Sequence, residues 1–425
     1  MDTTRRSFLI SGTAALGALA LSPVRAQSVS SAQLSISHGA PSYVNMLNAL
    51  GAAFHVEHPG LSVKFSADGD NWDPLLQNTL RESIVGALPD LTWQSLTYAS
   101  ILSKRGIAQP LNGVAGDASA VEKLGISRAL TDATVINGKL FAIPFGTSIP
   151  VVYYNMDLLR KAGYRKSTLP STWDEIIEIG RRVAALGGNI NGGYIEYTST
   201  NAWIFQNLLA SLGGRMMNPE ETKITFDGAE GLEALQILAR FGKANNVDMT
   251  LDQARQSFNA GVSGIHIRTA SGINSVAQAA AGRFELQIGQ FPIPNPNGRL
   301  VGAGHGFYMF AKNPDRQKAC WEFQKFAAQT KGQAILAKYT GYLPVNLIAL
   351  NDPEFLRQYL KANPYHRSIV KNLSIAGDQF SFPTLNTVKI VEIMAEEMRK
   401  VVTGRENAKD ALATMSAQTR KLLQT

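Results

Sequence analysis

The stretch IPFGTSIPVVYYNMDLLRKAGY, residues 143–164, contains two extended segments with no turn between them. The first segment ends in three small residues, Gly146, Thr147 and Ser148, and a β-branched and aromatic segment at residues 151–154 follows at once. Small residues tolerate a change in backbone direction and allow other groups to approach closely. The pattern leaves two interpretations: a strand that passes from one sheet into another, or a bulge inside one continuous sheet.

Segments on both sides of this stretch alternate between strand and helix patterns. Before it, QLSISH (33–38), LSVKFS (61–66) and PDLTWQS (89–95) read as strands, and amphipathic helical patterns separate them. After it the helical segments are longer, and a further apolar strand ends near residue 268. This alternation predicts an α/β fold with parallel sheets covered by helices. Because 425 residues exceed what one core usually organises, two lobes are expected.

The composition is that of a globular protein with a basic surface. The chain is 45% hydrophobic and 17% charged, and its formal net charge is +8. The positive charges are scattered and form no block of five or more, so they indicate a solvated surface. No basic stripe is interleaved with aromatic residues, and we therefore expect no nucleic-acid partner.

The N-terminus carries an export signal. Arg5 and Arg6 precede Phe8, and a short apolar run leads to Ala26 at the end of a small-residue cleavage pattern. Residues 1–26 are therefore predicted to be a signal peptide of the twin-arginine type, with an ordinary secretory signal and two chance arginines as the alternative. The mature protein is expected in the periplasm, without a lipid anchor.

The sequence shows no motif of a known enzyme class. The single cysteine, Cys320, lies among apolar residues and is expected to be a packed thiol. We find no H-E-x-x-H, no G-x-S-x-G and no complete P-loop, and the histidines are dispersed. No metal and no cofactor is therefore expected. A secreted enzyme acting on carbohydrate remains the rival class, and a surface adhesin is a third reading.

Four blocks of sequence resemble a known family. They are PFGTSIPVVYYNMDLLRKAGY, FNAGVSGIHIRTASG, GAGHGFYMFAKNPDRQKACWEFQKF and TGYLPVN. In this order they resemble the extracellular solute-binding proteins of ABC importers, in the carbohydrate group that includes maltose-binding and glycerol-3-phosphate-binding proteins. The resemblance implies a two-lobed periplasmic binding protein fold, in which each lobe is a mostly parallel sheet flanked by helices. It also implies a monomer that binds a small carbohydrate or polyol and delivers it to the transmembrane subunits of an ABC permease.

The resemblance also implies where the chain divides. Lobe 1 would comprise residues 27–146 and 305–341, and lobe 2 residues 147–304 and 342–425. The opening stretch, at residues 146–148, would be the first crossing between the lobes. A second crossing is expected near residues 300–304 and a third near residues 342–345.

Aromatic side chains are the first candidates for ligand contact, because sugars and polyols stack on aromatic faces. Trp72 follows a strand on a loop, and Trp203 follows a polar loop. By the resemblance both face the cleft, although ordinary core packing is the alternative for each. Trp93 ends a strand and could serve either purpose.

Polar candidates come from the loops that the resemblance places at the cleft. They lie at the ends of strands, in the expected crossings and at helix starts, where free backbone N–H groups can meet a ligand. The full set of polar and glycine candidates is His38, Ser42, Gln94, Ser148, Ser271, Gly272, Gly304, His305 and Tyr342.

The sequence defines the chemical class of the ligand less clearly than it defines the fold. The resemblance implies that glycerol-3-phosphate binders contribute an arginine from the segment after TGYLP, but here GDQFSFPTLNTVKIVEIM contains none. Arg268 could replace it, or could form an ion pair within a lobe. A neutral or weakly anionic carbohydrate or polyol is therefore favoured over glycerol 3-phosphate itself.

Overall fold

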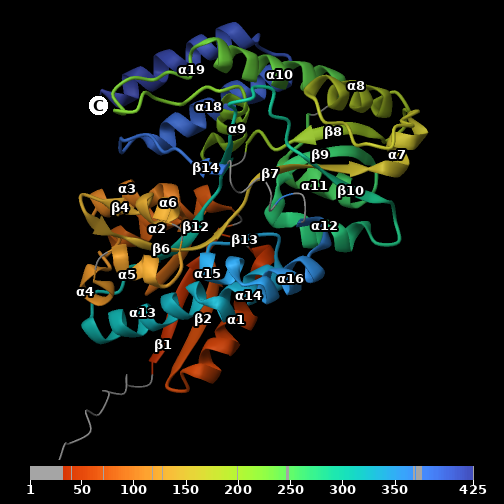
Figure 1. Ribbon diagram of the computed structural model, residues 1–425. Coiled ribbons are helices and arrows are strands. Elements are labelled where there is room, and N and C mark those ends of the chain that lie inside the picture. The colour runs from red at the N-terminus through yellow and green to blue at the C-terminus, as the bar shows by residue number, and fades with distance from the viewer. Residues whose placement is uncertain are drawn as a thin grey trace, which may run out of the picture.

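The computed structural model describes residues 32–39, 41–69, 71–116, 118–126, 128–198, 200–245, 248–366, 369 and 376–424. The signal peptide predicted for residues 1–26 lies outside these described residues. The described chain forms two lobes, each built on its own sheet (Figure 1).

The first lobe contains a six-stranded sheet in the order β13-β6-β12-β3-β1-β2. Its strands are β1 (Ala32–His38), β2 (Leu61–Ala67), β3 (Leu91–Ser95), β6 (Ala142–Thr147), β12 (His305–Met309) and β13 (Leu343–Pro344). A short ribbon, β4 (Val135–Ile136) with β5 (Lys139–Leu140), lies beside it. The helices of this lobe are α1 (Val44–Glu57), α2 (Trp72–Val85), α3 (Ala99–Lys104), α4 (Asn112–Ala115), α5 (Ala118–Lys123), α6 (Arg128–Asp132), α13 (Pro314–Ala328), α14 (Thr330–Tyr339), α15 (Leu347–Asn351) and α16 (Pro353–Ala362).

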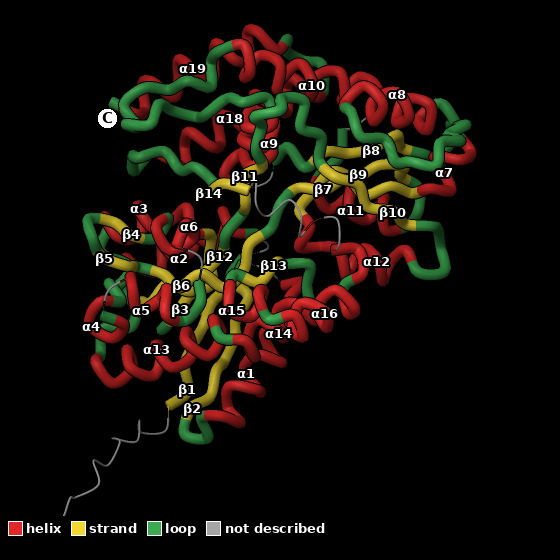
Figure 2. Tube along the Cα trace, in the orientation of Figure 1, coloured by secondary structure: helices red, strands yellow, loops and turns green. Residues whose placement is uncertain are grey.

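The second lobe contains a four-stranded sheet in the order β10-β7-β9-β8. Its strands are β7 (Pro150–Asn155), β8 (Asn191–Ile195), β9 (Ser263–Thr269) and β10 (Leu286–Gln290). A separate pair joins β11 (Leu300–Gly302) to β14 (Ala376–Asp378). The helices are α7 (Met156–Lys161), α8 (Trp173–Ala184), α9 (Trp203–Ser211), α10 (Ala229–Asn245), α11 (Leu251–Asn259), α12 (Ile273–Ala280), α18 (Thr387–Val402) and α19 (Ala408–Leu423). Figure 2 shows α8, α10 and α19 on one side of this sheet and α11 and α12 on the side toward the first lobe.

Short 3₁₀ turns complete the structure. They are η1 (Pro41–Tyr43), η2 (Leu96–Tyr98), η3 (Thr200–Ala202), η4 (Ala270–Gly272) and η5 (Pro364–His366). Three of these turns, η1, η2 and η4, follow the ends of β1, β3 and β9, where these strands end between the lobes. Of these turns, η1 and η4 contribute Ser42, Tyr43 and Ser271 to the cavity between the lobes.

Both sheets are mixed, which corrects the expectation of mostly parallel sheets. The pairs β1–β2, β1–β3 and β8–β9 are parallel, as the strand–helix alternation predicted. By contrast, β12 is antiparallel to β3 and β6, and β7 is antiparallel to β9 and β10. The reason is the connection between lobes. A strand that enters a sheet from the other lobe starts at the interlobe edge, where β1, β3 and β9 end, and therefore runs in the opposite direction.

Each lobe has its own apolar core. One core packs around β1, β3 and β6 and includes Trp93, Phe145 and Phe307, while the other packs around β7 and β9 and includes Tyr153 and Ile267. Cys320 is fully buried in the first core, so the expectation of a packed thiol is confirmed. Each sheet is therefore packed against an apolar core of its own.

The first two crossings lie side by side. The strand β6 ends at Thr147 in one sheet and β7 begins at Pro150 in the other, which confirms the interpretation of the opening stretch as a crossing. The chain returns through residues 303–304, between β11 and β12. Ser148 N–H donates to Ala303 O (3.1 Å) and Ala303 N–H donates to Ser148 O (2.7 Å). The two crossing segments are therefore hydrogen-bonded to each other.

Near residues 342–345, where a third crossing was expected, the chain stays in the sheet of the first lobe. There Leu343 pairs with Thr147, so β13 belongs to the six-stranded sheet, and α15 and α16 follow it. Gly341 N–H nevertheless donates to Ser271 O of the second lobe at 2.8 Å. The chain touches the second lobe here and then turns back, because β13 completes the edge beside β6. The lobe boundaries expected from the sequence otherwise stay a prediction.

Candidate functional site

A cavity of about 110 Å³ lies between the lobes, next to the paired crossings. Its lining includes Tyr43 and Trp72 from the first lobe and Arg268 and Ser271 from the second. Ala303 of the second crossing also lines it. The cavity is small compared with the roughly 300–1,000 Å³ typical of pockets for drug-sized ligands, and it therefore suits a small solute.

Six of the residues proposed from the sequence line this cavity. They are Ser42, Trp72, Trp203, Ser271, His305 and Tyr342. They come from η1, α2, α9, η4, β12 and the residue before β13, so elements far apart in the sequence meet at one place. Their role in ligand binding stays a prediction.

The other five proposed residues lie behind or beside the cavity. Gln94 is fully buried, and its Nε2 donates to Thr79 Oγ1 at 2.8 Å in the first core. His38 is buried at the end of β1 and is absent from the cavity lining. Gln94 therefore binds within the first lobe, and His38 is buried outside the lining.

The remaining three are part of the backbone framework. Ser148 Oγ lies 2.7 Å from Thr269 Oγ1 and accepts a hydrogen bond from Ser271 N–H at 3.0 Å. Gly304 O accepts from Leu96 N–H at 3.0 Å, and a Cβ at Gly304 would lie 2.8 Å from Leu96 Cδ1. A Cβ at Gly272 would lie 2.7 Å from Arg268 Nη2. These three residues therefore hold lining residues in place.

An aromatic wall forms the first-lobe side of the cavity. The ring centroids of Trp72 and His305 are 4.2 Å apart, with an interplanar angle of 33°. Trp93 stands edge-on behind Trp72 at 5.0 Å and is fully buried, so it belongs to the core. Trp72 is therefore the tryptophan of this lobe that can offer a face to a ligand.

Burial keeps the imidazole of His305 neutral. Its removal from water lowers its pKa to about 3, and a hydrogen bond with the backbone of Ala303 opposes this shift only partly. Tyr342 Oη lies 3.3 Å from His305 Nδ1. A neutral imidazole that is already positioned by a hydroxyl can either donate or accept one hydrogen bond to a sugar hydroxyl.

Trp203 lines the cavity from the second lobe. It begins α9 directly after two residues with strained backbone conformations. Asn201 and Ala202 both have left-handed backbone conformations, with φ of 57° and 51°. Each such residue costs on the order of 1–3 kcal/mol. Trp203 Nε1 donates to Val301 O at 2.8 Å, and the side chain is 4% exposed. Trp203 therefore serves both the core of the second lobe and the cavity wall.

Hydroxyl groups join the two lobes across the cavity. Tyr43 Oη donates to Ser271 Oγ at 2.9 Å, and Ser271 Oγ lies 3.0 Å from Thr269 Oγ1. Thr269 in turn contacts Ser148 of the first crossing. Tyr43 belongs to the first lobe and the other three to the second or to the crossing. This network connects the two lobes and places hydroxyl oxygens beside the cavity.

A buried charged cluster forms the second-lobe side. Arg255 of α11 donates from Nε and Nη2 to the two carboxylate oxygens of Glu196, at 2.9 and 3.0 Å. His266 Nε2 lies 3.1 Å from Glu196 Oε1. Burial disfavours the charged form of Glu196, but Arg268 and Arg255 outweigh it and hold the pKa of Glu196 well below its usual range. Glu196 is therefore an anion with its acceptors occupied.

Arg268 also belongs to this cluster. Within the described part of the chain, its guanidinium donates no hydrogen bond. Its Nε lies 3.4 Å from Glu196 Oε1 and is buried without a hydrogen-bond partner. The residue is 9% exposed and lines the cavity. Burying a cation whose N–H donors make no hydrogen bond costs free energy unless another group accepts those hydrogen bonds.

Sequence reasoning missed several lining residues, chiefly Tyr43, Asn71, Glu196 and Arg255. Glu196 had a visible signal, since a carboxylate directly follows the apolar strand at residues 191–195. Arg255 had none, because an arginine on the polar face of a helix is usually solvated. The pairing of Arg255 with Glu196 depends on how α11 packs against β8 and β9, which the sequence does not specify.

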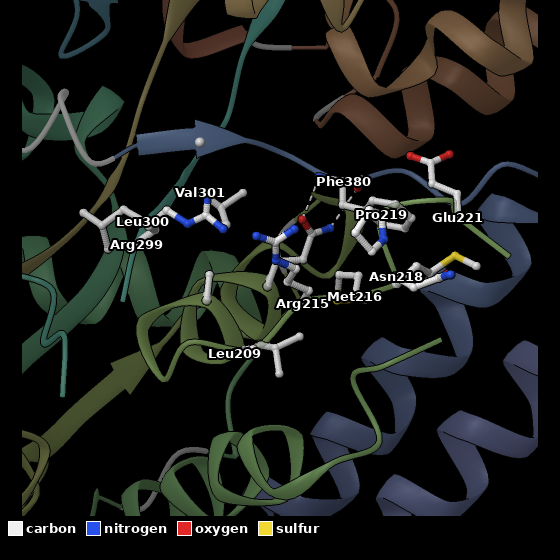
Figure 3. Close-up of a pocket in the computed structure, with 15 residues that line it drawn as sticks. Leu209, Arg215, Met216, Asn218, Pro219, Glu221, Arg299, Leu300, Val301 and Phe380 are labelled. Carbon is white, nitrogen blue, oxygen red and sulfur yellow. Dashed lines mark hydrogen bonds between the residues drawn. The ribbon is translucent and has the colours of Figure 1, made fainter. Parts of the chain in front are cut away.

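A second hollow, of about 270 Å³, lies entirely within the second lobe (Figure 3). Arg299, Leu300 and Val301 form one side, and Phe380 and Pro219 lie on the other. Both of its arginines, Arg215 and Arg299, are exposed. Because the described residues that line it all belong to the second lobe, ligand binding there would not connect the lobes. The interlobe cavity is therefore the stronger candidate.

The described residues contain neither a metal cluster nor a membrane-spanning helix. No cluster of three or more histidine, cysteine, aspartate or glutamate residues there is arranged to hold a metal ion. Within the same residues, no helix combines the length and apolarity that crossing a membrane requires.

Comparison with known sequences gives one family match. A family model described as bacterial extracellular solute-binding protein matches residues 49–363. The sn-glycerol-3-phosphate-binding periplasmic protein UgpB of Rhizobium meliloti (strain 1021) is 25% identical over 289 residues, which cover 65% of this chain and 66% of that protein. The protein of the same name from Brucella abortus (strain 2308) is 27% identical over 296 residues, with the same coverage. The chain thus spans slightly less than two thirds of the length of these curated relatives.

Comparison with solved structures shows the same fold. UgpB from Mycobacterium tuberculosis, in complex with glycerophosphocholine, superposes with a TM-score of 0.78 at 19% identity, over 93% of this chain and 99% of that one. Maltose-bound MalE3 of T. maritima gives a TM-score of 0.76 at 18% identity, over 92% and 99%. At these identities the likeness establishes the two-lobed architecture and leaves the ligand open.

Proposed function

Because the chain belongs to the family of bacterial extracellular solute-binding proteins, we propose that it captures a small carbohydrate or polyol between its lobes and delivers it to an ABC permease. The named relatives bind sn-glycerol 3-phosphate, and the structural neighbours were solved with glycerophosphocholine or maltose. The proposal places this chain in the same class of import, as a monomer in the periplasm, with no nucleic-acid partner.

One observation carries the proposal: the interlobe cavity has walls from both lobes and lies against the hinge. Trp72 and Tyr43 face it from one lobe, and Arg268 and Ser271 from the other. A ligand that contacts both walls at once stabilises the closed arrangement relative to the open one. Its differential contacts with the two states set how far the equilibrium shifts.

The cavity chemistry supports a hydroxylated ligand. Trp72 offers an aromatic face, and His305, Tyr43, Ser271 and Tyr342 offer hydrogen-bonding groups around it. Carbohydrates and polyols present both C–H faces and hydroxyls, which match this combination. In the proposed cycle, the closed form docks on the permease and opening of the hinge releases the ligand.

The rival is a secreted enzyme acting on carbohydrate. The relatives are binding proteins. Glu196, the buried carboxylate among the described lining residues, is occupied by Arg255 and His266. Glycoside hydrolysis usually requires two carboxyl groups flanking the bond. We therefore propose binding without turnover, and no bound cofactor.

The experiment combines a thermal-shift screen with product analysis. The mature protein would be heated with sugars, polyols and their phosphates and acids, and each mixture would be analysed chromatographically afterwards. The proposal expects at least one compound to raise the melting temperature and to be recovered unchanged. A compound that is consumed would favour the enzyme. No shift with any compound, in protein shown to be free of co-purified ligand, would contradict capture of such solutes.

A further inference from the structure

The lobes also meet outside the cavity, where α2 and η2 of the first lobe face η3 and α18 of the second. A hollow of about 110 Å³ lies there, and its lining includes Asp73 and Tyr98 from the first lobe and Asn201 and Glu392 from the second. The helix α2 contacts η3 directly. The described residues that line this hollow differ from those that line the interlobe cavity, so this contact is separate from the ligand wall.

The carboxylate of Asp73 makes hydrogen bonds to both lobes. Tyr98 Oη donates to Asp73 Oδ1 within the first lobe. Burial raises the pKa of Asp73, and the hydrogen bonds from Tyr98 and from the backbone N–H of Asn201 oppose this shift. Glu392 on α18 also raises the pKa of Asp73, and Lys389 lies 3.3 Å from the Glu392 carboxylate. Because Asn201 belongs to the second lobe, its N–H connects the lobes through Asp73.

The backbone of Asn201 is held in an unusual conformation. Asn201 and Ala202 have φ of 57° and 51°, in the left-handed region. Such conformations persist only where surrounding groups hold them. Gln206 Nε2 donates to Asn201 O at 2.9 Å, and Asn201 Nδ2 donates to Phe380 O. These contacts within the second lobe fix the direction of the Asn201 N–H, and Asp73 accepts from it across the lobes.

The same hydrogen bond joins the two tryptophans of the cavity. Trp72 begins α2 and directly precedes Asp73, while Trp203 begins α9 two residues after Asn201. Both indoles line the cavity, one from each lobe. The bond between Asp73 and Asn201 therefore connects the starts of two helices whose first residues are cavity walls, and it depends on the lobes being together.

From this geometry we infer that Asp73 is a positioning residue for ligand capture: its hydrogen bond to the backbone of Asn201 stabilises the closed lobes and fixes Trp72 relative to Trp203. This inference rests on the proposed function and adds to it a residue outside the cavity lining. A hydrogen bond that spans the lobes is lost when they separate, so it favours the closed arrangement over the open one. Because the ligand leaves from the open arrangement, loss of the bond raises the dissociation rate and leaves the association rate unchanged.

The variants are Asp73→Ala and Asp73→Asn, with Asp174→Ala as the matched control. Asp174 directly follows Trp173 at the start of α8, as Asp73 follows Trp72 at the start of α2. Its side chain is 84% exposed and pairs with Arg240 of the same lobe. The control therefore removes an aspartate from the same position of a helix without removing a contact between the lobes.

The measurements are rates of binding and a distance between the lobes. The probes are glycerol 3-phosphate, glycerophosphocholine and maltose, the compounds named for the relatives and structural neighbours. Stopped-flow tryptophan fluorescence gives the association and dissociation rates. Pulsed dipolar spectroscopy, with spin labels at Lys104→Cys on α3 and Lys409→Cys on α19, gives the distance with and without probe. A melting curve shows whether each variant is folded.

Asp73→Ala should raise the dissociation rate about tenfold or more, as expected for a lost hydrogen bond to a charged group. Its association rate should stay within about twofold of wild type, and its short-distance population should shrink. Asp73→Asn keeps an acceptor oxygen and loses the charge, so its dissociation rate should lie between those of wild type and Asp73→Ala. It carries the test if Asp73→Ala does not fold. Asp174→Ala should match wild type in both measurements.

The results that would overturn the inference differ from those that would overturn the proposed function. If the folded Asp73 variants match wild type in dissociation rate and distance, or if Asp174→Ala changes both as much as Asp73→Ala does, Asp73 has no positioning role and ligand capture stands. If no probe binds, the ligand-free distances decide. A short-distance population that Asp73→Ala loses would support the contact while capture of these solutes fails, and its absence from wild type would contradict the contact itself.

Discussion

Ser148 and Ala303 exchange two backbone hydrogen bonds, of 3.1 and 2.7 Å, at the point where the chain passes between the lobes in both directions. The side chain of Ser148 also contacts Thr269 and Ser271 at the edge of the cavity. Ala303 lines the cavity, so the paired crossings and the cavity wall share a residue. We therefore expect a small change in the backbone at residues 146–148 to affect both.

Gly146→Val should hinder closure. A Cβ at this position would lie 3.0 Å from Leu336 Cδ2 and 3.3 Å from the Tyr342 ring, and a β-branched side chain also stiffens the backbone. Small-angle scattering of wild type should show compaction with saturating ligand, and the variant a smaller change. Gly113→Val, at an open position of α4, is the control. Equal compaction and affinity in the Gly146 variant would place the hinge elsewhere.

Trp203→Ala should lower both stability and affinity. The buried indole packs in the core of the second lobe, and a tryptophan truncation in a core costs about 3–5 kcal/mol. Trp203→Phe keeps most of the apolar volume but loses the hydrogen bond to Val301 O. We expect it to recover much of the stability.

Urea unfolding and calorimetry on both Trp203 variants separate the two roles. If folded Trp203→Ala binds the ligand with wild-type affinity, Trp203 makes no contribution to ligand binding.

Stability should fall as the pH drops from 7 to 5. Burial lowers the pKa of His266, His305 and His366, and that of His305 falls to about 3. The unfolded state therefore binds more protons between the folded pKa values and the unfolded value of about 6.5. The stability contribution of each histidine is complete above pH 6.5 and is lost below it, at no more than about 1.4 kcal/mol per pH unit.

Urea titrations at pH 7.5, 6.5 and 5.5 test this dependence. His305→Asn should give a flatter profile than wild type. A profile of wild type that rises toward pH 5 would contradict the assignment of buried neutral histidines.

Export can be tested separately, although the signal lies outside the described residues. Replacing Arg5 and Arg6 with lysine should leave the precursor in the cytoplasm if the pathway reads the arginine pair. Cell fractionation followed by immunoblotting gives the answer. Normal periplasmic accumulation of the double variant would indicate an ordinary secretory route.

Much of the fold follows from local sequence. The crossing at residues 146–148 was predictable because small residues directly join two extended segments, and the strand–helix alternation predicted the α/β class. The directions of β7 and β12 were not predictable from periodicity, since side-chain alternation is the same in parallel and antiparallel strands. The place of β13 was missed because two residues are too few to carry a pattern.

Part of the site was predictable from the positions of its residues along the chain. Trp72, His305 and Tyr342 lie directly at the ends of segments that reach the cleft, so their positions in the chain were informative. Glu196 and Arg255 are 59 residues apart and meet only through the packing of α11. Gln94 and His38 are absent from the cavity lining, because a residue at the end of a strand can face either the cleft or the core, which the sequence does not decide; their part in binding stays a prediction.

The central claim, that the two lobes close on a solute, can be measured directly as a distance between them. Spin labels at Lys104→Cys on α3 and Lys409→Cys on α19 would report it, since Cys320 is fully buried and both lysines are exposed. Pulsed dipolar spectroscopy would compare ligand-free protein with protein saturated by the tightest-binding solute of the screen. The account predicts a broad or long distance distribution without ligand and a narrow, shorter one with it. An unchanged distribution, with binding confirmed by calorimetry on the same labelled sample, would contradict it.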